Sequence, residues 1–263
     1  MRIEPGTRAI VTGASRGIGR ATAQALADRG ARVGLVARDE SALAELAGEL
    51  PGDPLVLVAD VTDRTAIESA VADFLEQAGG LEVAVANAGL AHYGPFLDQP
   101  LEHAEQMVNL NVLGTIYTVH AVLGPMRDRA AGHVVVVSSG AGLRAFPWGA
   151  VYGATKAADR GFAEALRHEL SGTGVSVSTV FPGEVETALH DHQRDKLPDW
   201  RRDENTISAE QVAEAIIEVV EHDRRAAHVP GAVRALGLNW IAPRLTDRLV
   251  AAMRGPTAAP RRD

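Results

Sequence analysis

A glycine-rich turn between a strand-like run and a helical pattern constrains this 263-residue chain more than any other feature. Residues 7–12 form a short apolar run rich in β-branched residues, and residues 13–19 read Gly-Ala-Ser-Arg-Gly-Ile-Gly. A helical pattern follows from about residue 19 to residue 29. This order is the context in which a dinucleotide pyrophosphate binds at a helix N-terminus, although the spacing G-x-x-x-G-x-G differs from the general G-x-G-x-x-G motif. The candidate cofactor-binding residues of this turn are Gly13, Ser15, Arg16, Gly17, Ile18 and Gly19.

Strand signals recur between helical patterns along the whole chain. They fall at about 7–12, 32–37, 55–59, 82–86, 133–138, 175–181 and, more briefly, 227–229. Strands that alternate with helices predict a parallel sheet covered on both faces. We therefore expect an α/β fold: a single Rossmann-type doubly wound domain with a mostly parallel seven-stranded sheet and helices on both faces. It should span residues 1–254, with a variable lid at about 188–206 and a flexible tail at 255–263.

Composition excludes some classes of function. The formal charge of −8 argues against a general nucleic-acid binder, and the absence of cysteine excludes disulfides. No apolar leader precedes the first strand and no apolar stretch approaches membrane-spanning length, so we expect a cytoplasmic protein without a membrane span. His190 and His192 have the spacing of a metal pair, but no third ligand is evident and no metal is expected.

Tyr152 and Lys156 stand four residues apart in the segment Tyr-Gly-Ala-Thr-Lys. Because four residues make about one helical turn, both side chains project from one helix face. A cation that close favours ionisation of a phenol, so the pair indicates phenol acid–base chemistry near neutral pH. Taken alone the spacing is weak evidence, because most such pairs are a partly buried tyrosine beside a solvated lysine.

The end of the second expected strand bears on the choice of cofactor. An NAD site usually places an acid there to bind the ribose hydroxyls, whereas this chain has Ala37 followed by Arg38. A guanidinium can bind a 2′-phosphate in a bidentate manner, and Arg16 adds a second cation. Asp39 opposes this, since an acid one residue further weakens phosphate binding. The pattern favours NADP(H), with NAD(H) as the alternative.

With these features the chain resembles the short-chain dehydrogenase/reductase (SDR) family, in its classical branch, over roughly residues 5–190. The motifs occur in order: residues 12–19, Asp60-Val61, Asn87-Ala88-Gly89, Asn111, Ser139, Tyr152 with Lys156, and Pro182-Gly183 with Thr187. Ser139 lies thirteen residues before Tyr152, with Gly142 three residues further on, which favours Ser139 over Ser138 as the catalytic serine.

The resemblance implies a catalytic tetrad of Asn111, Ser139, Tyr152 and Lys156. Tyr152 would exchange a proton with the carbonyl or alcohol oxygen, and Ser139 would hydrogen-bond the same oxygen. Lys156 would favour ionisation of the phenol and bind the nicotinamide ribose. Asn111 would position a water behind Lys156 and so complete a proton relay.

Further cofactor contacts follow from the same resemblance. Asp60 and Val61 would flank the adenine, although Asp60 could equally cap the helix that begins near Asp63. The remaining residues expected to line the cofactor are Asn87, Ala88, Gly89, Pro182, Gly183, Val185 and Thr187. The substrate would lie against His92, Tyr93, Arg144, Phe146, Trp148 and Leu189, whose aromatic rings suggest an apolar ketone or secondary alcohol of some bulk.

The C-terminal part departs from the family. Where many members end on a segment that packs in a tetramer, this chain has Gly-Leu-Asn-Trp-Ile-Ala-Pro at 237–243 and a helix expected to about residue 253. Its apolar side chains, Trp240 and Ile241 among them, could cover the pocket, pack on a partner or touch a membrane surface, but we expect them to pack in the core. Helices at about 101–130 and 152–171 should form a homodimer interface, with Ala163 and Leu166 suited to close packing. A homotetramer is not required.

Two other classes remain as alternatives to a carbonyl reductase or alcohol dehydrogenase that binds a small-molecule substrate. A non-catalytic dinucleotide-binding regulator would keep the fold but typically lose the tyrosine or lysine. A nucleotide-sugar epimerase of the extended branch shares Y-x-x-x-K but expects a different glycine spacing and a longer C-terminal domain. Since all four catalytic positions are filled, the enzyme is the favoured interpretation.

Overall fold

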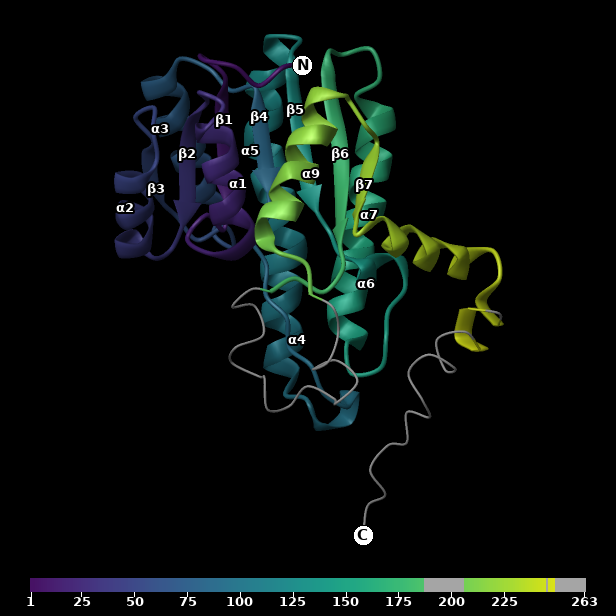
Figure 1. The fold of residues 1–263 in the computed structure, drawn as a ribbon. Coiled ribbons are helices and arrows are strands. Elements are labelled where there is room, and N and C mark those ends of the chain that lie inside the picture. The colour runs from purple at the N-terminus through teal and green to yellow at the C-terminus, as the bar shows by residue number, and fades with distance from the viewer. Residues whose placement is uncertain (187–205, 245, 249–263) are drawn as a thin grey trace.

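The computed structural model describes residues 1–186, 206–244 and 246–248. Within this part of the chain the strands form one parallel sheet in the order β3-β2-β1-β4-β5-β6-β7 (Figure 1). The strands are β1 (Arg8–Thr12), β2 (Arg32–Ala37), β3 (Leu55–Val58), β4 (Val83–Ala86), β5 (Gly132–Val137), β6 (Val175–Pro182) and β7 (Ala226–Val229). The predicted seven-stranded, doubly wound α/β fold is confirmed.

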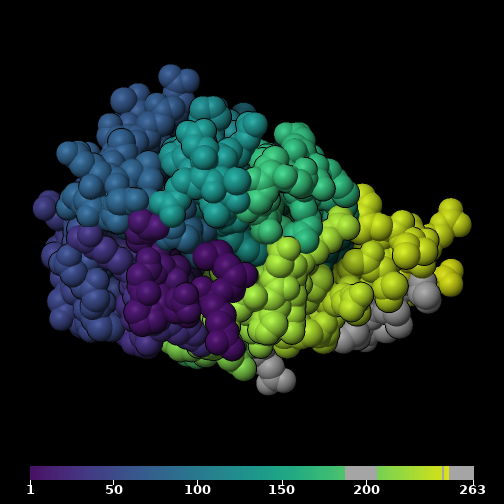
Figure 2. All heavy atoms as spheres, turned by 90° about the horizontal axis from the view of Figure 1, so that it is seen from above, coloured from purple at the N-terminus to yellow at the C-terminus, as the bar shows by residue number. Residues whose placement is uncertain are grey.

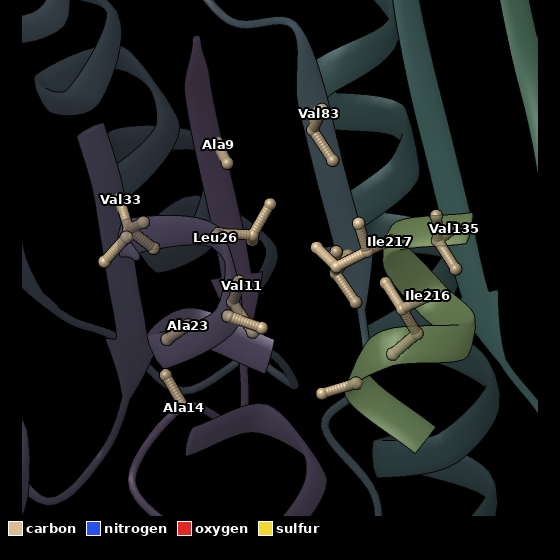
Figure 3. Packing of buried hydrophobic residues seen from close by; sticks show 14 of the residues in the cluster. Ala9, Val11, Ala14, Ala23, Leu26, Val33, Val83, Val135, Ile216 and Ile217 are labelled. Carbon is tan, nitrogen blue, oxygen red and sulfur yellow. The ribbon is translucent and has the colours of Figure 1, made fainter. Parts of the chain in front are cut away.

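Alternating side chains of the strands face two helical layers. On β1, Ala9 and Val11 face one layer and Ile10 faces the other. The first layer comprises α1 (Gly17–Ala27), α2 (Glu40–Glu49) and α9 (Ala209–Glu221), and the second comprises α3 (Arg64–Ala78), α5 (Gly114–Asp128) and α7 (Ala150–Glu169). In the first layer α1 and α9 lie side by side over the central strands, with Leu26 and Ile217 buried beneath them (Figure 3).

The strand order reverses next to β1. The chain moves outward from β1 through β2 to β3 and then returns to place β4 on the other side of β1. In open parallel sheets a ligand binds beyond the carboxyl ends of the strands at such a reversal. The short elements η1 (Phe96–Asp98), α4 (Leu101–Met107) and α6 (Gly140–Leu143) follow β4 and β5, so they belong to this end of the sheet (Figure 1).

Helix signals in the sequence are also confirmed. Ser208 and Gln211 form the expected capping box at the start of α9. The helix expected at about 101–130 is a continuous helical run in which a π-helical segment, η2 (Val108–Leu113), separates α4 from α5. Residues 243–244 and 246–248 are helical, in agreement with the helix expected near Pro243 to Met253; residues 245 and 249–253, like the tail at 255–263, lie outside the described residues.

The run Leu101–Asp128 is long and apolar enough to cross a membrane by length and composition alone. The expectation that no stretch approaches that length is therefore wrong. In this structure α5 packs on α3 and η2 packs on α7, and side chains such as Val119, Val122 and Met126 are buried in the core. A core helix of an α/β protein meets the same criterion.

The C-terminal segment differs from the expectation of core packing. The 3-10 helix η4 (Gly231–Trp240) projects from the sheet edge beyond β7 (Figures 1 and 2). Trp240 and Ile241 are 64% and 83% exposed, because the 3-10 segment packs on the body mainly through Val233 and Leu236.

The proposed role of Ala163 and Leu166 in a dimer contact is also wrong, since both side chains pack against the sheet in the core of the chain itself.

Candidate active site

The glycine turn at the end of β1 is built for close backbone contact. Gly13 adopts a φ of +67°, which a residue with a Cβ atom rarely takes. A Cβ atom at Gly19 would lie 2.1 Å from the Gly13 carbonyl oxygen, so only glycine lets α1 start this close to the strand. The N-terminus of α1 therefore opens directly onto the carboxyl end of β1, where its backbone N–H groups can bind an anion.

Thr12 and Asn87 join the ends of β1 and β4. The Thr12 hydroxyl accepts hydrogen bonds from the backbone N–H groups of Asn87 and Ala88, at 3.1 and 3.2 Å. The Asn87 side chain returns one to the Thr12 carbonyl oxygen at 2.9 Å. These contacts fix the two loops that flank the reversal point, so the site is shaped before any ligand binds.

A cleft of about 480 Å³ lies at this point. Most of the cofactor residues predicted from the sequence line it, together with two members of the tetrad. They are Gly13, Ser15, Arg16, Gly17, Ile18, Arg38, Asp60, Val61, Asn87, Ala88, Gly89, Tyr152 and Lys156. Residues not predicted as contacts complete the wall: Ala37, Asp39, Ala42, Ala59, Leu90, Leu110, Val137 and Ser138. The single cleft thus joins the glycine turn to the tyrosine–lysine pair.

Charged groups meet at the end of β2 and β3. Arg38, whose side chain is 75% exposed, lies 3.6 Å from Asp60. Burial raises the pKa of Asp60, but hydrogen bonds from the Thr62 N–H and hydroxyl and the Arg38 charge outweigh it, so the net pKa is lowered and Asp60 is a carboxylate. The suggestion that Asp60 caps the next helix is wrong, because Asp63 caps α3. Asp39 caps α2 by accepting from the Ala42 N–H at 3.0 Å.

Tyr152 lies in the first turn of α7 with its ring buried against Tyr93. The two rings meet edge to face with centroids 5.6 Å apart. Ala91, Met107 and Ala141 complete this cluster. The packing holds the phenol in a fixed orientation at the wall of the cleft.

The two serines after β5 have different partners. The Ser138 hydroxyl is buried and donates to the Lys156 carbonyl oxygen at 2.7 Å, which ties β5 to α7. The Ser139 hydroxyl accepts from the Ala141 N–H at 3.1 Å, a contact that uses a lone pair and not the proton. Gly142 is required by this arrangement, because a Cβ atom there would lie 2.5 Å from the Lys156 carbonyl oxygen. Among the described residues, the proton of Ser139 rather than that of Ser138 is therefore left for a substrate oxygen, although it is Ser138 that lines the cleft.

Lys156 is buried with its ammonium group held by two protein acceptors. Its Nζ donates to the Val137 carbonyl oxygen at 3.0 Å and to Asp159 Oδ2 at 2.9 Å. A Cβ atom at Gly89 would lie 3.6 Å from this Nζ, which places the ammonium beside the loop that follows β4. Burial lowers the pKa of Lys156, but the Asp159 carboxylate and an ionised Tyr152 raise it by more, so the net pKa is raised.

Asn111 lies in the π-helical segment η2 and is fully buried. Its side-chain amide bonds both the N–H and the carbonyl oxygen of Leu90, at 2.8 and 2.9 Å. It also donates to the Thr155 hydroxyl at 3.0 Å. Asn111 thus locks the loop after β4 to α7 just behind the Tyr152–Lys156 pair, and a π-helical turn at such a place is typical of functional sites.

The residues predicted to contact substrate have mixed placements. His92 stacks on His103 with ring centroids 3.8 Å apart, beside a small hollow that Trp148 also lines. Phe146 packs at the edge of the Tyr152 cluster. Tyr93 is buried and supports Tyr152. Arg144 turns toward the C-terminal segment, where it bonds Asp247 Oδ1 at 2.6 Å.

Other predicted residues lie at or beyond the end of β6. Gly183 donates its N–H to the Val229 carbonyl oxygen at 2.7 Å, and Pro182 is the last residue of β6. Val185 pairs with Ile207 in an isolated parallel bridge. Thr187, Leu189 and all of the predicted lid except residue 206 lie outside the described residues.

Several supporting residues of the site were not predicted from the sequence. The Thr12 hydroxyl holds the Asn87 backbone, the Thr155 hydroxyl holds the Asn111 amide, and the Asp159 carboxylate holds the Lys156 ammonium. Asp159 could have been found, because it follows Lys156 by three residues and so lies on the same helix face. Thr12 acts across the sheet and carries no local signal.

Comparison with known proteins agrees with this geometry. A family model described as short chain dehydrogenase matches residues 7–198. An uncharacterised oxidoreductase of Staphylococcus saprophyticus is 36% identical over 185 residues, which cover 69% of this chain and 79% of the relative.

Solved structures share the fold over most of the chain. A short-chain dehydrogenase/reductase from Burkholderia phymatum in complex with NAD is 25% identical with a TM-score of 0.82, and covers 98% of this chain and 99% of that one. An alcohol dehydrogenase from the archaeon Thermococcus sibiricus, complexed with 5-hydroxy-NADP, is 28% identical with a TM-score of 0.74 over 84% of this chain and 94% of that one. The chain therefore belongs to the short-chain dehydrogenase family of oxidoreductases, enzymes that act on CH–OH or carbonyl groups.

Proposed function

We propose that this protein is an NADP(H)-dependent oxidoreductase that interconverts a ketone or aldehyde and the corresponding alcohol. The observation that carries the proposal is that Tyr152 and Lys156 line the same cleft as the glycine turn and two arginines. The residues fit a dinucleotide. The N-terminus of α1 offers N–H groups to a pyrophosphate, and the cleft continues from there to the tyrosine.

In this reaction the nicotinamide supplies or accepts the hydride, and the chain's own residues handle the substrate oxygen. Tyr152 donates a proton to that oxygen in reduction and removes it in oxidation. The Ser139 hydroxyl donates to the same oxygen and stabilises negative charge as it develops. Lys156 keeps a positive charge beside the phenol and donates to the ribose, while Asn111 holds the loop and helix that carry them.

The preference for NADP(H) rests on charge at the mouth of the cleft. Arg16 and Arg38 are both in its wall, and a guanidinium binds a phosphate well. Asp39 is also in the wall, but its carboxylate accepts the Ala42 N–H as the cap of α2, which lessens its repulsion of a 2′-phosphate. In the absence of cofactor, the Arg38 guanidinium can pair with the Asp60 carboxylate.

For the substrate we propose an apolar and fairly bulky carbonyl compound or secondary alcohol. Support comes from the loops near Tyr152, where Phe146 packs beside the catalytic cluster and Trp148 lies in the neighbouring loop. The Gly94 N–H donates to the Trp148 carbonyl oxygen at 2.9 Å, which joins the loop after β4 to the loop before α7. The two loops that would face the substrate are thus linked.

A screen of ketones, aldehydes and alcohols with NADPH, NADH and their oxidised forms tests the proposal, with absorbance followed at the nicotinamide band. We expect turnover with aryl or long-chain ketones and a lower KM for NADPH than for NADH. Tighter binding of NADH would overturn the cofactor preference. Tight binding of either cofactor with no turnover of any carbonyl would instead favour a dinucleotide-binding regulator.

A further inference from the structure

The ammonium group of Lys156 has three N–H donors, and the protein already uses two of them. One donates to the Val137 carbonyl oxygen and one to Asp159 Oδ2. The Lys156 side chain is 6% exposed and that of Asp159 is 1% exposed, so the ion pair lies inside the protein. Among the residues that the structure describes, one donor is left for the cleft side, next to Gly89.

Asp159 in turn connects Lys156 to the helix behind it. The hydroxyl of Thr115 on α5 lies beside this carboxylate. That hydroxyl donates its single proton to the Asn111 carbonyl oxygen at 2.7 Å. Side chains of the protein therefore lie between Lys156 and the Asn111 backbone, along the route on which the sequence predicts a relay water.

The pair has a defined electrostatic effect. A buried lysine without a partner loses its proton readily, because burial disfavours the charged form. Within the described part of the chain, the groups with an electrostatic effect on Lys156 are Asp159 and Tyr152, both on α7. β5, the loop after β4, η2 and α5 contribute Val137, Gly89, Asn111 and Thr115, none of which titrates. Tyr152 assists only when it is ionised, so Asp159 is the group that keeps the lysine charged before the phenol loses its proton.

We propose that Asp159 is a positioning residue for Lys156: it keeps the buried ammonium charged and directs a single N–H toward the cofactor. The inference rests on the proposed function, in which Lys156 binds the nicotinamide ribose. It implies that Lys156 bonds one ribose hydroxyl rather than two while the Asp159 contact persists.

The composition of the chain allows a direct test. The chain contains two lysines, Lys156 and Lys196, so a Lys196→Arg variant grown with lysine labelled with ¹³C at Cε has one lysine signal. We would titrate that signal between pH 7 and 10.5 in the Lys196→Arg parent and with Asp159→Asn added. Adding Tyr152→Phe to both removes the other group that titrates beside the ammonium. Glu169→Gln is the matched control, because it removes one negative charge from an exposed position of the same helix.

We expect the midpoint of the Lys156 signal to lie above the ordinary value of about 10.4 in the parent and in Glu169→Gln, so that the signal stays in the charged form through most of the titration. In Asp159→Asn its midpoint should fall by at least about one pH unit, which is a tenfold change in the proton affinity. The affinity for NADPH should then weaken by up to about tenfold between pH 7 and pH 9.5 in Asp159→Asn alone, because the ammonium is lost. Asp159→Glu, which keeps the charge, should restore a flat affinity profile.

An unchanged midpoint in folded Asp159→Asn overturns the proposal. If that variant does not fold, the titration of the Lys196→Arg parent still tests the proposal. A Lys156 midpoint below the ordinary value of about 10.4 in the parent would show that Asp159 does not keep the ammonium charged. The titration needs neither cofactor nor turnover. A failure of the proposed function, seen as no NADPH binding by the wild type, is therefore distinguishable from a failure of this inference.

Discussion

At the scale of single residues, Arg38 offers the sharpest test of cofactor choice. Its guanidinium is exposed at the mouth of the cleft, 3.6 Å from Asp60. Arg38→Asp should weaken NADPH binding by at least about tenfold and leave NADH binding equal or tighter, because an attractive contact with the 2′-phosphate becomes a repulsion. Fluorescence titrations with both cofactors measure this. An equal loss for the two cofactors would mean that Arg38 does not contact the 2′-phosphate.

His133 makes a separate prediction about stability. It is buried on β5 and lies 2.8 Å from the Ser178 hydroxyl, which itself donates to the Arg224 carbonyl oxygen. Burial lowers the pKa of His133 to about 4. Since the unfolded chain binds this proton near pH 6.5 and the folded chain does not, the free energy of unfolding should fall as pH drops from 6.5 to 4, by roughly 3 kcal/mol from this group.

Urea unfolding of the wild type and His133→Gln at pH 7, 5.5 and 4.5 checks this value. The variant should lose less stability on acidification, by up to about 1.4 kcal/mol per pH unit. If the free energy of unfolding falls equally with pH in the wild type and in the variant, His133 is not the source of this acid sensitivity.

At the scale of elements, the contact between α1 and the end of β1 decides whether the cofactor site forms. Gly19→Ala places a Cβ atom 2.1 Å from the Gly13 carbonyl oxygen. We expect it to destabilise the fold by several kcal/mol or to displace α1 and abolish cofactor binding. Gly48→Ala in α2 is the control, because its Cβ atom meets nothing within 4 Å, and it should stabilise the fold by up to about 1 kcal/mol. Wild-type stability and affinity in Gly19→Ala would contradict the structure of the turn.

The elements also show what a sequence can predict. The strands followed from β-branched runs such as Val134–Val137, and the start of α9 from its capping box, since both are local signals. The glycine turn is itself a local signal for part of the cofactor site. The resemblance to the SDR family added Asp60, Val61 and residues 87–89, which lie after strands that parallel topology brings together. The pairings of Thr12 with Asn87 and of Asn111 with Leu90 could not be predicted, because they join segments that are far apart in the chain. The exposure of Trp240 was not predicted, because an apolar run in the sequence does not show which of its side chains other residues cover.

At the scale of the whole molecule, apolar side chains remain exposed near the active-site end of the sheet. They are Phe96, Leu97, Leu101 and Val108, on η1, α4 and η2. We expect a homodimer of two 27.7 kDa chains at micromolar concentration, with this surface covered by the partner. Sedimentation measures the mass. Leu101→Asp should weaken the dimer, while Leu238→Asp on η4 should leave it intact. A wild type that sediments as a monomer would contradict the expectation.

Transfer of a labelled hydride from cofactor to substrate tests the proposed reaction directly. The enzyme is incubated with NADPH carrying deuterium at one face of nicotinamide C4 and with a ketone from the screen, and the alcohol is analysed by mass spectrometry. We expect one deuterium on the carbinol carbon from only one of the two labelled faces. Tyr152→Phe should lose this transfer by about 10²–10⁴-fold while NADPH binding is kept. Unlabelled alcohol, or a Tyr152→Phe variant with more than about a tenth of the wild-type rate, would contradict the proposed reaction.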